Sequence, residues 1–430
     1  MSLPLLGAGM ATDGPSAVLD LNFASLLSLT PSVGPTPSYT RASTGTYFDA
    51  SGVLTTAAIN GPRFDHVYNG VSWVSKGLLI EEARTNSVLQ SNALATSGIW
   101  TNAANRNTMA QSGEISPDSA ANAWTGTCVV TTASGCRLEQ GVAGAAGTYT
   151  LTQFVKKGNN GFCGMAIYAT GGPTDIAYYL FDLTLGIFGS PTITGYTNVS
   201  VSAKSVGSGW WRISLTITKG NAATMVIAGA ITANSLTDGG CTTGQTNLFY
   251  GYQLEAGAFP TSYIPTTAAA VTRSADVCQI TGGDFSGFWN ASEGSFVTEA
   301  DSIGFSTTGP DRYIISFTSS GTANISHAIF LPTPGLSFDV YNSTLQARSS
   351  YTQPNAGDSF KLASCYKAND FAATLNGSAV QTDTSGTVPT INNVGIGHYP
   401  SFNQYANCHI ARLRYFNTRL INSQLVALSS

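Results

Sequence analysis

The strongest constraint on the fold is a regular alternation of apolar and polar residues. Every odd position from 211 to 217 holds Trp, Ile or Leu, and the even positions between them hold Arg, Ser and Thr. Even positions from 248 to 254 repeat the pattern with Leu and Tyr. A period of two separates the side chains onto the two faces of an extended chain, which predicts half-buried antiparallel strands. Strands of this kind between Gly-rich turns are typical of a jelly-roll sandwich.

The composition favours the same fold class. Charged residues make up only 10% of the 430 residues, against about 25% in an average soluble domain. Ser, Thr, Asn and 46 Gly take their place. Long helices usually carry Glu, Lys, Arg and Ala on their solvated face, so this mixture favours strands and turns. We therefore expect an all-β protein with two antiparallel β-sandwich domains and a small N-terminal β attachment region.

Charge and hydropathy argue against two classes of partner. The net charge is -4, and Lys156 and Lys157 are the only adjacent Lys pair. A nucleic-acid binder should carry a basic patch, so no nucleic-acid partner is expected. No unbroken apolar run approaches the roughly 18–20 residues of a membrane span, so no membrane insertion is expected. The first basic residue is Arg41. Because a signal peptide begins with positive charge, we expect synthesis in the cytoplasm without export.

The pattern along the chain divides it into four parts. Residues 1–17 lack periodicity and are interpreted as an N-terminal arm. Residues 18–90 contain short strands and form the predicted attachment region. The longer alternating strands of residues 91–265 predict the first sandwich, and residues 266–430 predict the second. A Pro-containing stretch at 259–276, without alternation, is the expected linker.

Two turn signals and one helix signal stand out locally. The sequences DASG at 49–52 and NG at 376–377 each separate two apolar runs, and both predict β-hairpins. Residues 422–428 predict a short C-terminal helix capped by Asn422.

Three segments of the N-terminal part carry a family resemblance. Residues 39–44 (YTRAST), 62–65 (PRFD) and 77–81 (GLLIE) together resemble the N-terminal block of many phage and prophage virion proteins. In that group a carbohydrate-binding-module-like jelly roll follows the block. Residues 209–212 (GWWR) and 252–257 (YQLEAG) are similar to the last strands of that jelly roll. The resemblance implies that residues 91–265 form such a jelly roll.

The C-terminal part resembles a second domain of the same group. Residues 292–294 (SEG), 366–369 (YKAN) and 375–377 (LNG) are similar to the phage form of the concanavalin-like or laminin-G-like sandwich. The resemblance extends over nearly all of residues 18–430 and transfers no catalytic or ligand residues. It implies a virion protein of a tail or head fibre, spike or other appendage, made in the host cytoplasm and exposed on the particle. The implied partners are other virion proteins, host surface glycan and further copies of the chain, with a trimer expected first.

Signatures of catalysis are missing from the sequence. There is no GxSxG, no GxxxxGK[ST] and no HExxH motif. Glu81 and Glu82 are adjacent, so on a strand they would lie on opposite faces and could not act on one bond. We expect a non-enzymatic protein without a cofactor. A purely structural capsid, collar or tail decoration protein is the first alternative, and a polysaccharide depolymerase is the third reading. The metal content stays unknown; Asp284, Glu299 and Asp301 are candidate ligands for a structural Ca²⁺.

Two places combine aromatic rings with polar groups, as carbohydrate binding requires. Trp210 lies on the strand face opposite Trp211, beside Arg212, and could be an exposed platform or be covered by another part of the chain. The second place is the predicted loop 398–405, where the aromatic rings could bind sugar or attach the loop to its own domain. The candidate ligand-binding residues are Trp210, Arg212, Tyr399, Phe402, Asn403 and Tyr405.

The seven cysteines include no CxxC pair, so a zinc or redox motif has no support. Cys128 and Cys136 flank a predicted hairpin whose turn lies near 132–135. Facing positions on a hairpin can lie at disulfide distance, so this pair is a candidate disulfide. The other interpretation is that the cysteines are small buried hydrophobic residues.

Overall fold

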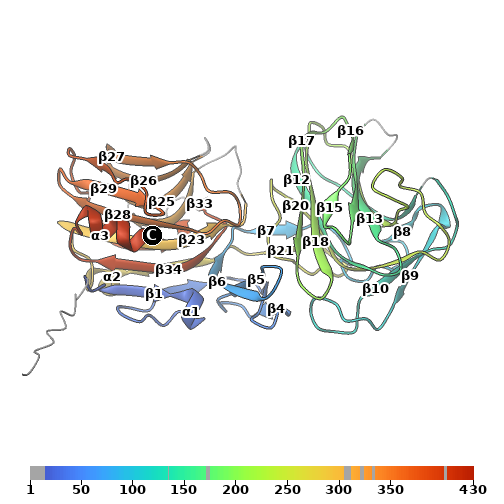
Figure 1. Ribbon diagram of the computed structural model, residues 1–430, viewed down its shortest axis with the longest axis horizontal. Coiled ribbons are helices and arrows are strands. Elements are labelled where there is room, and N and C mark those ends of the chain that lie inside the picture. The colour runs from blue at the N-terminus through green and yellow to red at the C-terminus, as the bar shows by residue number, and fades with distance from the viewer. Residues whose placement is uncertain are drawn as a thin grey trace, which may run out of the picture.

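The computed structural model describes residues 15–133, 135–170, 175–304, 311–319, 324–331, 335–400 and 404–430. Strands account for 51% of the structure and helices for 5%, which confirms the all-β expectation. Figure 1 shows two sandwiches along the long axis of the molecule, with the N-terminal strands beneath and between them. None of the helices in the described ranges is both long and apolar enough to cross a membrane.

The central sandwich packs two antiparallel sheets against each other. The first, in sheet order, consists of β17 (Thr197–Ser205), β18 (Trp210–Lys219), β12 (Gly147–Lys157), β20 (Thr246–Ala256), β10 (Trp124–Cys128) and β9 (Asn107–Gln111). The second consists of β15 (Ile187–Phe188), β14 (Ile176–Asp182), β13 (Phe162–Ala169), β19 (Met225–Thr232), β11 (Cys136–Val142) and β8 (Thr101–Asn102), with β16 (Thr192–Thr194) paired to β14. A 3-10 turn (Ala103–Asn105) follows β8.

The alternation found in β18 places its residues in this core as expected. Ile213, Leu215 and Ile217 of β18 are all fully buried between the sheets. In β20 the expected alternation holds only for Tyr252 and Leu254, whereas Leu248 and Tyr250 pack in a separate cluster, because the register against β12 shifts between Tyr250 and Gln253. The even-numbered side chains of β18 therefore lie on the outer face of the six-stranded sheet.

The C-terminal sandwich has two larger sheets. One contains β30 (Gln381–Asp383), β29 (Phe371–Leu375), β28 (Phe360–Lys367), β23 (Glu293–Ser302), β34 (Cys408–Phe416), β6 (Trp73–Ile80) and β5 (Phe64–Tyr68), with β1 (Leu19–Asn22) also paired to β34. The other contains β2 (Ser38–Thr40), β22 (Val277–Thr281), β31 (Asn393–Ile396), β24 (Arg312–Thr318), β25 (Asn324–Leu331), β26 (Gly335–Asn342) and β27 (Thr344–Tyr351), with β32 (His398–Tyr399) and β33 (Gln404–Tyr405) beside β24.

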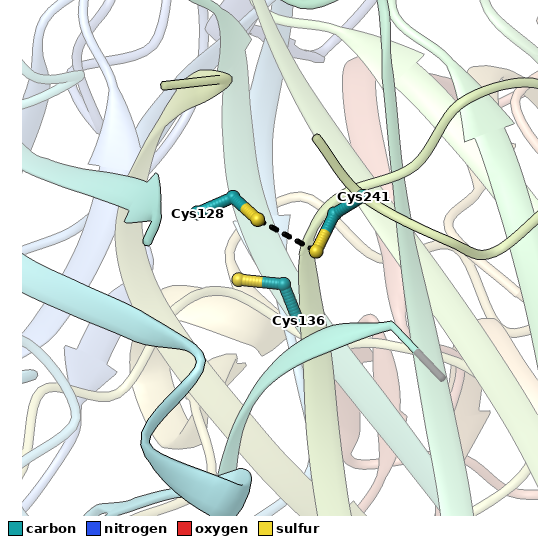
Figure 2. Close-up of side chains that lie close together, drawn as sticks. All are labelled: Cys128, Cys136 and Cys241. Atoms are coloured by element: carbon teal, nitrogen blue, oxygen red, sulfur yellow. Dashed lines mark hydrogen bonds between the residues drawn. The ribbon is translucent and has the colours of Figure 1, made fainter. Parts of the chain in front are cut away.

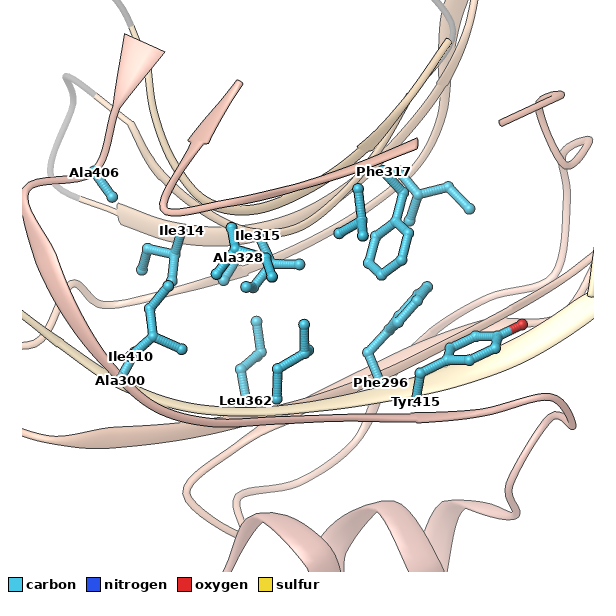
Figure 3. Packing of buried hydrophobic residues seen from close by; sticks show 14 of the residues in the cluster. Phe296, Ala300, Ile314, Ile315, Phe317, Ala328, Leu362, Ala406, Ile410 and Tyr415 are labelled. Carbon is cyan, nitrogen blue, oxygen red and sulfur yellow. The ribbon is translucent and has the colours of Figure 1, made fainter. Parts of the chain in front are cut away.

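Aromatic and branched aliphatic side chains fill the space between these two sheets. Figure 3 shows Phe296 and Tyr415 on one sheet, facing Ile314, Ile315 and Phe317 on the other. The ring centroids of Phe296 and Phe317 are 4.4 Å apart. Aromatic pairs stabilise a fold by more than their buried area alone provides, and they do so in preferred geometries. This layer therefore fixes how the two sheets face each other.

Four strands of residues 18–90, β1, β2, β5 and β6, are built into the sheets of the C-terminal sandwich, which differs from the separate attachment region expected from the sequence. Strand β34 pairs with β23 along one edge. Its other edge is shared by β6, opposite Cys408–Ile410, and by β1, opposite Arg412–Tyr415. The N-terminal strands thus cover an edge of β34 that would otherwise expose unpaired backbone groups. Short-range alternation cannot reveal a pairing between segments almost 400 residues apart.

Three small elements complete the junction between the sandwiches. Strands β3 (Gly45–Phe48) and β4 (Leu54–Ala57) form the hairpin predicted around 49–52, and Asp49 Oδ1 accepts hydrogen bonds from the turn amides of Ser51 and Val53. Strand β7 (Arg84–Asn86) pairs with β21 (Val271–Arg273) where the chain enters and leaves the central sandwich.

The remaining local predictions concern a turn and the helices. Asn376 and Gly377 both have positive φ, at 48° and 68°, which confirms the tight hairpin turn. The C-terminal helix α3 spans Asn422–Ser429. The residue at its N-cap is Ile421 rather than Asn422, and Gln424 Oε1 accepts its amide proton. Two shorter helices are α1 (Phe23–Leu26) and α2 (Gly282–Ser286).

Candidate functional site

A cavity of about 720 Å³ lies where the N-terminal strands meet the two sandwiches. We call it the junction cavity. Its lining comes from the β3–β4 hairpin, β5 and β6, the outer face of β17 and β18, the 258–263 segment, and the ends of β23 and β34. Because these segments are far apart in the chain, the cavity exists only when both sandwiches and the N-terminal strands are assembled.

One wall of the junction cavity is aromatic. Trp73 of β6 is half-buried, and its ring centroid lies 4.9 Å from that of Phe48 and 5.7 Å from that of Tyr68. Phe259 and Tyr47 also line this space. Trp73 packs over the turn of the β3–β4 hairpin, so its ring is held in place at the cavity. Such a wall offers flat apolar surface to a ligand.

Another wall of the junction cavity carries hydroxyl groups and cations. The register of β17 and β18 pairs Ser200 with Thr216, Ser202 with Ser214, and Lys204 with Arg212, and all six residues line the cavity. Their neighbours Ala203 and Val201 also pack against the core of the central sandwich. One face of a two-stranded edge therefore presents two rows of short hydroxylated side chains that end in a pair of cations.

The two cations of this wall differ in their environment. Arg212 is half-buried; its Nη2 donates to Thr261 O at 2.7 Å and to Thr152 Oγ1 at 3.3 Å. Its guanidinium carbon lies 5.5 Å from the centroid of the Phe154 ring. Lys204 has an exposed side chain, and the carboxylates that act on its charge are those of Asp65 and Asp301. Within the described part of the chain, neither cation forms an ion pair with a carboxylate.

A third group of residues at the cavity is ionic. His409 of β34 donates from Nδ1 to Asp301 Oδ1 at 2.7 Å, and its Nε2 lies 2.9 Å from Asp65 Oδ2. Lys76 Nζ lies 3.1 Å from Asp301 Oδ2. Cys408 and Ile410 belong to the C-terminal core, so His409 between them faces the other way, toward the cavity. We call these four residues the cavity ion group.

The cavity ion group shifts the protonation of its members. Burial alone would lower the pKa of His409, but the carboxylates of Asp301 and Asp65 outweigh it and raise that pKa to about 9. Burial would raise the pKa of Asp301, but His409 and Lys76 outweigh it and lower that pKa to about 2. At neutral pH the imidazolium and the Asp301 carboxylate are therefore both charged.

A second ionic group is almost completely buried, and its member Glu81 reaches the lining of the cavity. Arg63 Nη1 lies 2.6 Å from Glu81 Oε2, and its Nη2 bonds to Asp276. Arg41 Nη1 lies 3.1 Å from Asp276 Oδ1, and Arg273 Nη1 lies 3.4 Å from Glu81 Oε2. All five side chains are at most 1% exposed. We call them the sealed ion group; three of them belong to the N-terminal segments with the family resemblance.

The structure corrects the role expected for Trp210. This side chain is only 2% exposed, and its Nε1 donates to Ile115 O at 3.1 Å. It packs in a cluster with Phe154, Tyr250 and Tyr263, with Phe48 and Trp73 beside them. Because the N-terminal hairpin and the chain near Ile115 cover this end of β18, Trp210 is not an exposed platform. Arg212, predicted with it, does line the junction cavity.

The second predicted site is packed onto its own domain. Tyr399 is 1% exposed, and its ring centroid lies 4.7 Å from that of Tyr313. Tyr405 is 9% exposed and its ring is stacked with that of His398. These two tyrosines attach the segment to the C-terminal sandwich, which corrects their interpretation as sugar-binding side chains. Phe402 and Asn403 lie outside the described residues.

The cysteines differ from the predicted arrangement. All seven are buried free thiols. Cys128 ends β10 and Cys136 begins β11, and these strands belong to opposite sheets of the central sandwich rather than to one hairpin. The close contact of Cys128 is with Cys241, whose Sγ lies 2.6 Å away (Figure 2). No motif spacing links positions 128 and 241, so the sequence offered no signal for this pair.

The candidate calcium ligands do not converge. Asp284 is exposed on α2, Glu299 lies near Arg414, and Asp301 is engaged by His409 and Lys76. In the described ranges, the one group of three His, Cys, Asp or Glu side chains close enough to share a metal ion is Cys128, Cys136 and Cys241.

Sequence reasoning missed most of the junction cavity. Trp73, Lys204 and His409 were not predicted as site residues, although each lines it. The alternation of β18 was the available signal, because it placed Arg212 on the face opposite the core. Extending that pattern to residues 200–204, where Ser and Lys alternate with Val and Ala, would have identified the second strand of the same wall.

Comparisons with known proteins give little further information. No protein-family model and no curated protein match the chain. The carbohydrate-binding module CBM40 of a Ruminococcus gnavus IT-sialidase, bound to α2,6-sialyllactose, is 13% identical with a TM-score of 0.28, and the match covers 33% of this chain and 85% of the module. A Trypanosoma rangeli sialidase in complex with the inhibitor DANA is 9% identical with a TM-score of 0.27, covering 72% of this chain and 60% of its own. Similarities at these scores carry no argument about function.

Proposed function

We propose that the protein is a non-enzymatic, glycan-binding component of a bacteriophage particle and that the junction cavity is its binding site. The proposal rests on the combination, in one cavity of about 720 Å³, of aromatic side chains around Trp73 with the hydroxyl-rich face of β17 and β18. A sugar ring presents a CH face and a rim of hydroxyl groups, so it is complementary to both walls.

The charges of the cavity favour a glycan that contains an acidic sugar. Lys204 and Arg212 stand side by side on paired strands, and neither forms an ion pair with a carboxylate of the described chain. The cavity ion group, in contrast, already pairs its carboxylates with cations. A ligand carboxylate next to Lys204 and Arg212 would gain charge-assisted hydrogen bonds that a neutral sugar cannot form.

The state of the cavity carboxylates supports binding without hydrolysis. Glycosidases pair a carboxylate with a carboxylic acid whose pKa is raised, so that it can donate a proton. Of the lining carboxylates, Asp301 has its pKa lowered to about 2 by its cations. The pKa of Glu81 is also lowered, because Arg273 and Arg63 outweigh the effect of burial. Both therefore stay ionised at neutral pH.

A place on a phage particle is supported by the sequence resemblance over residues 18–430. One lectin-type site usually binds weakly, so several copies on one particle would supply avidity. We propose a homo-oligomer, with a trimer as the first expectation, held by other virion proteins and exposed to the host surface. Light scattering of the purified chain, and immunogold labelling of particles, would test these two statements.

The binding proposal is tested by glycan-array screening of the purified full chain, followed by titration calorimetry with the strongest ligand. We expect an acidic glycan to bind. Lys204→Gln changes an exposed side chain, and we expect it to weaken binding roughly 5- to 20-fold, the loss of about 1–2 kcal/mol of a charge-assisted contact. Trp73→Ala should reduce binding further.

Trp211→Ala is the matched control for Trp73→Ala. Trp211 is also half-buried, but its Nε1 donates to Leu183 O on the core side of β18, away from the cavity. We expect it to lower stability and leave the affinity unchanged. If Lys204→Gln and Trp73→Ala both bind glycan with wild-type affinity, the junction cavity is not the binding site. If the folded wild type bound no glycan at all, the structural decoration role would be favoured, and release of reducing ends would favour a depolymerase.

A further inference from the structure

Three thiols gather at one end of the central sandwich, outside the junction cavity. The Sγ atoms of Cys128, Cys136 and Cys241 all lie within 4.8 Å of one another, as Figure 2 shows. Cys128 ends a strand of the six-stranded sheet and Cys136 begins a strand of the seven-stranded sheet. Cys241 precedes β20 and forms an isolated bridge with Thr132. The cluster therefore joins both sheets and the connection that enters β20.

The distances within the cluster single out one pair. Cys128 and Cys241 Sγ lie 2.6 Å apart, which approaches the roughly 2.05 Å of a disulfide bond. A zinc ion bound to thiolates at about 2.3 Å would hold their sulfurs about 3.7 Å apart. Cys136 lies beside both of these thiols, and its own thiol also donates to Arg106 O at 3.4 Å. The geometry thus favours a covalent pair with a third thiol beside it over a three-thiolate metal site.

The surroundings of the pair also favour its closure. Thr132 and Cys241 exchange two backbone hydrogen bonds, of 2.9 and 2.8 Å. The carbonyl oxygen of Val130 lies 3.3 Å from Cys128 Sγ and 3.6 Å from Cys241 Sγ, so both sulfurs lie beside the same peptide group. The side chains of Val129 and Val130 are exposed, so the thiols lie one layer beneath the surface. Closing the bond needs a small movement of two sulfur atoms and no change of strand pairing.

We propose that Cys128 and Cys241 form a disulfide when the protein meets an oxidising environment, and that Cys136 remains a thiol beside it. With a small-molecule disulfide such as oxidised glutathione as oxidant, the thiolate of one cysteine attacks a glutathione sulfur and releases one reduced glutathione. The second cysteine then attacks the mixed disulfide and releases the other. Two protein thiols are oxidised, one glutathione disulfide is reduced, and the two protons end on the two glutathione thiols.

The bond would link residues 113 positions apart. A crosslink that closes a long loop restricts the unfolded chain strongly, so it stabilises the folded state. We expect oxidation to raise the Tm of the central sandwich by roughly 5–15 °C. Burial and the neighbouring Cys128 raise the pKa of the Cys241 thiol, so little Cys241 thiolate is present at neutral pH. The rate of closure should then rise with pH between about 7 and 9.

The test uses the full chain, incubated with oxidised or reduced glutathione and then alkylated, digested and analysed by mass spectrometry. We expect one crosslinked peptide, between Cys128 and Cys241, which reduction removes together with the gain in Tm. Cys128→Ser and Cys241→Ser should each abolish both. Cys136→Ser should keep both, as should Cys163→Ser, which changes another buried cysteine of the same sandwich.

If a serine variant fails to fold, mass spectrometry of the oxidised wild type still identifies which cysteines are crosslinked. A crosslink that joins Cys136 to either partner, or no crosslink in folded protein after prolonged oxidation at high pH, would overturn it. Stoichiometric binding of Zn²⁺ that protects all three thiols from alkylation would overturn it as well, in favour of a metal site.

Discussion

The two ionic groups at the junction consist of similar side chains but differ in their environment and role. The sealed ion group pairs three arginines with two carboxylates, all almost completely buried. The cavity ion group, in a neighbouring part of the same junction, borders a space large enough for a sugar. Buried charges are tolerated only when they are paired, so the first group specifies how the N-terminal segments join the chain after the central sandwich. The second can stabilise the fold and also shape the electrostatics of a ligand site.

The N-terminal segments that resemble phage virion proteins contribute three residues to the sealed ion group. Arg41, Arg63 and Glu81 come from the three N-terminal segments, and Asp276 and Arg273 follow the central sandwich. Their ion pairs form a continuous chain, and the two pairs made by Asp276 join it to residues 235 and 213 positions away. The quoted motif residues therefore have a structural role, whereas the lining of the junction cavity comes largely from residues outside those motifs.

The largest effect is expected when the sealed ion group loses a charge. Asp276→Asn leaves Arg41 and Arg63 without their shared carboxylate in a buried site, which should lower the free energy of unfolding by about 3–5 kcal/mol. Urea unfolding followed by Trp fluorescence measures this loss. Glu293→Gln is the control, because its pair with Lys367 is solvent-exposed at 2.9 Å and should contribute less than about 1 kcal/mol. Equal effects of the two variants would remove the distinction between sealed and open groups.

An intermediate effect is expected from the cavity ion group, and it should depend on pH. In the folded protein the pKa of His409 is raised from 6.5 to about 9. The stabilisation by protonated His409 is therefore complete below the pKa of the unfolded chain. It is lost as the pH rises through the pKa of the folded protein. Between pH 6.5 and 9 the stability should fall by about 3 kcal/mol at most. The groups that face the imidazole are Asp65, Asp301 and, through Asp301, Lys76.

The measurement for His409 is the urea midpoint across this pH range, for the wild type and for His409→Gln. The variant cannot titrate, so the difference between the two curves isolates the imidazole from other groups that ionise in the same range. A difference that stays constant with pH would show that the imidazole is neutral in the folded protein.

The smallest effect is expected at the aromatic segment that was first interpreted as a sugar site. Tyr399→Phe removes a buried hydroxyl and keeps the ring against Tyr313, so it should cost about 1 kcal/mol of stability. Because Tyr399 does not line the junction cavity, glycan affinity should stay within about twofold of the wild type. Calorimetric titration with the array-selected glycan checks this, and a large loss of affinity would move the site to the C-terminal sandwich.

Much of the local structure was predictable from the sequence. The alternation in β18 identified its core-facing residues, and the turn residues at 49–52 and 376–377 identified two hairpins. Arg212 was placed correctly on the outer face, in the wall of the cavity. These features depend on the geometry of a few consecutive residues, since side chains alternate along a strand and a tight turn requires particular backbone angles.

Tertiary structure decided what covers each face and which distant segments meet. The alternation assigned Trp210 and Arg212 to one face, but only the fold shows that Trp210 is covered while Arg212 borders a cavity. It also decided that β1 and β6 complete the C-terminal sheet and that Cys128 contacts Cys241. The physical reason is that hydrophobic burial is non-directional: a periodic pattern establishes that a face must be buried, whereas shape and charge complementarity across the whole chain select the partner.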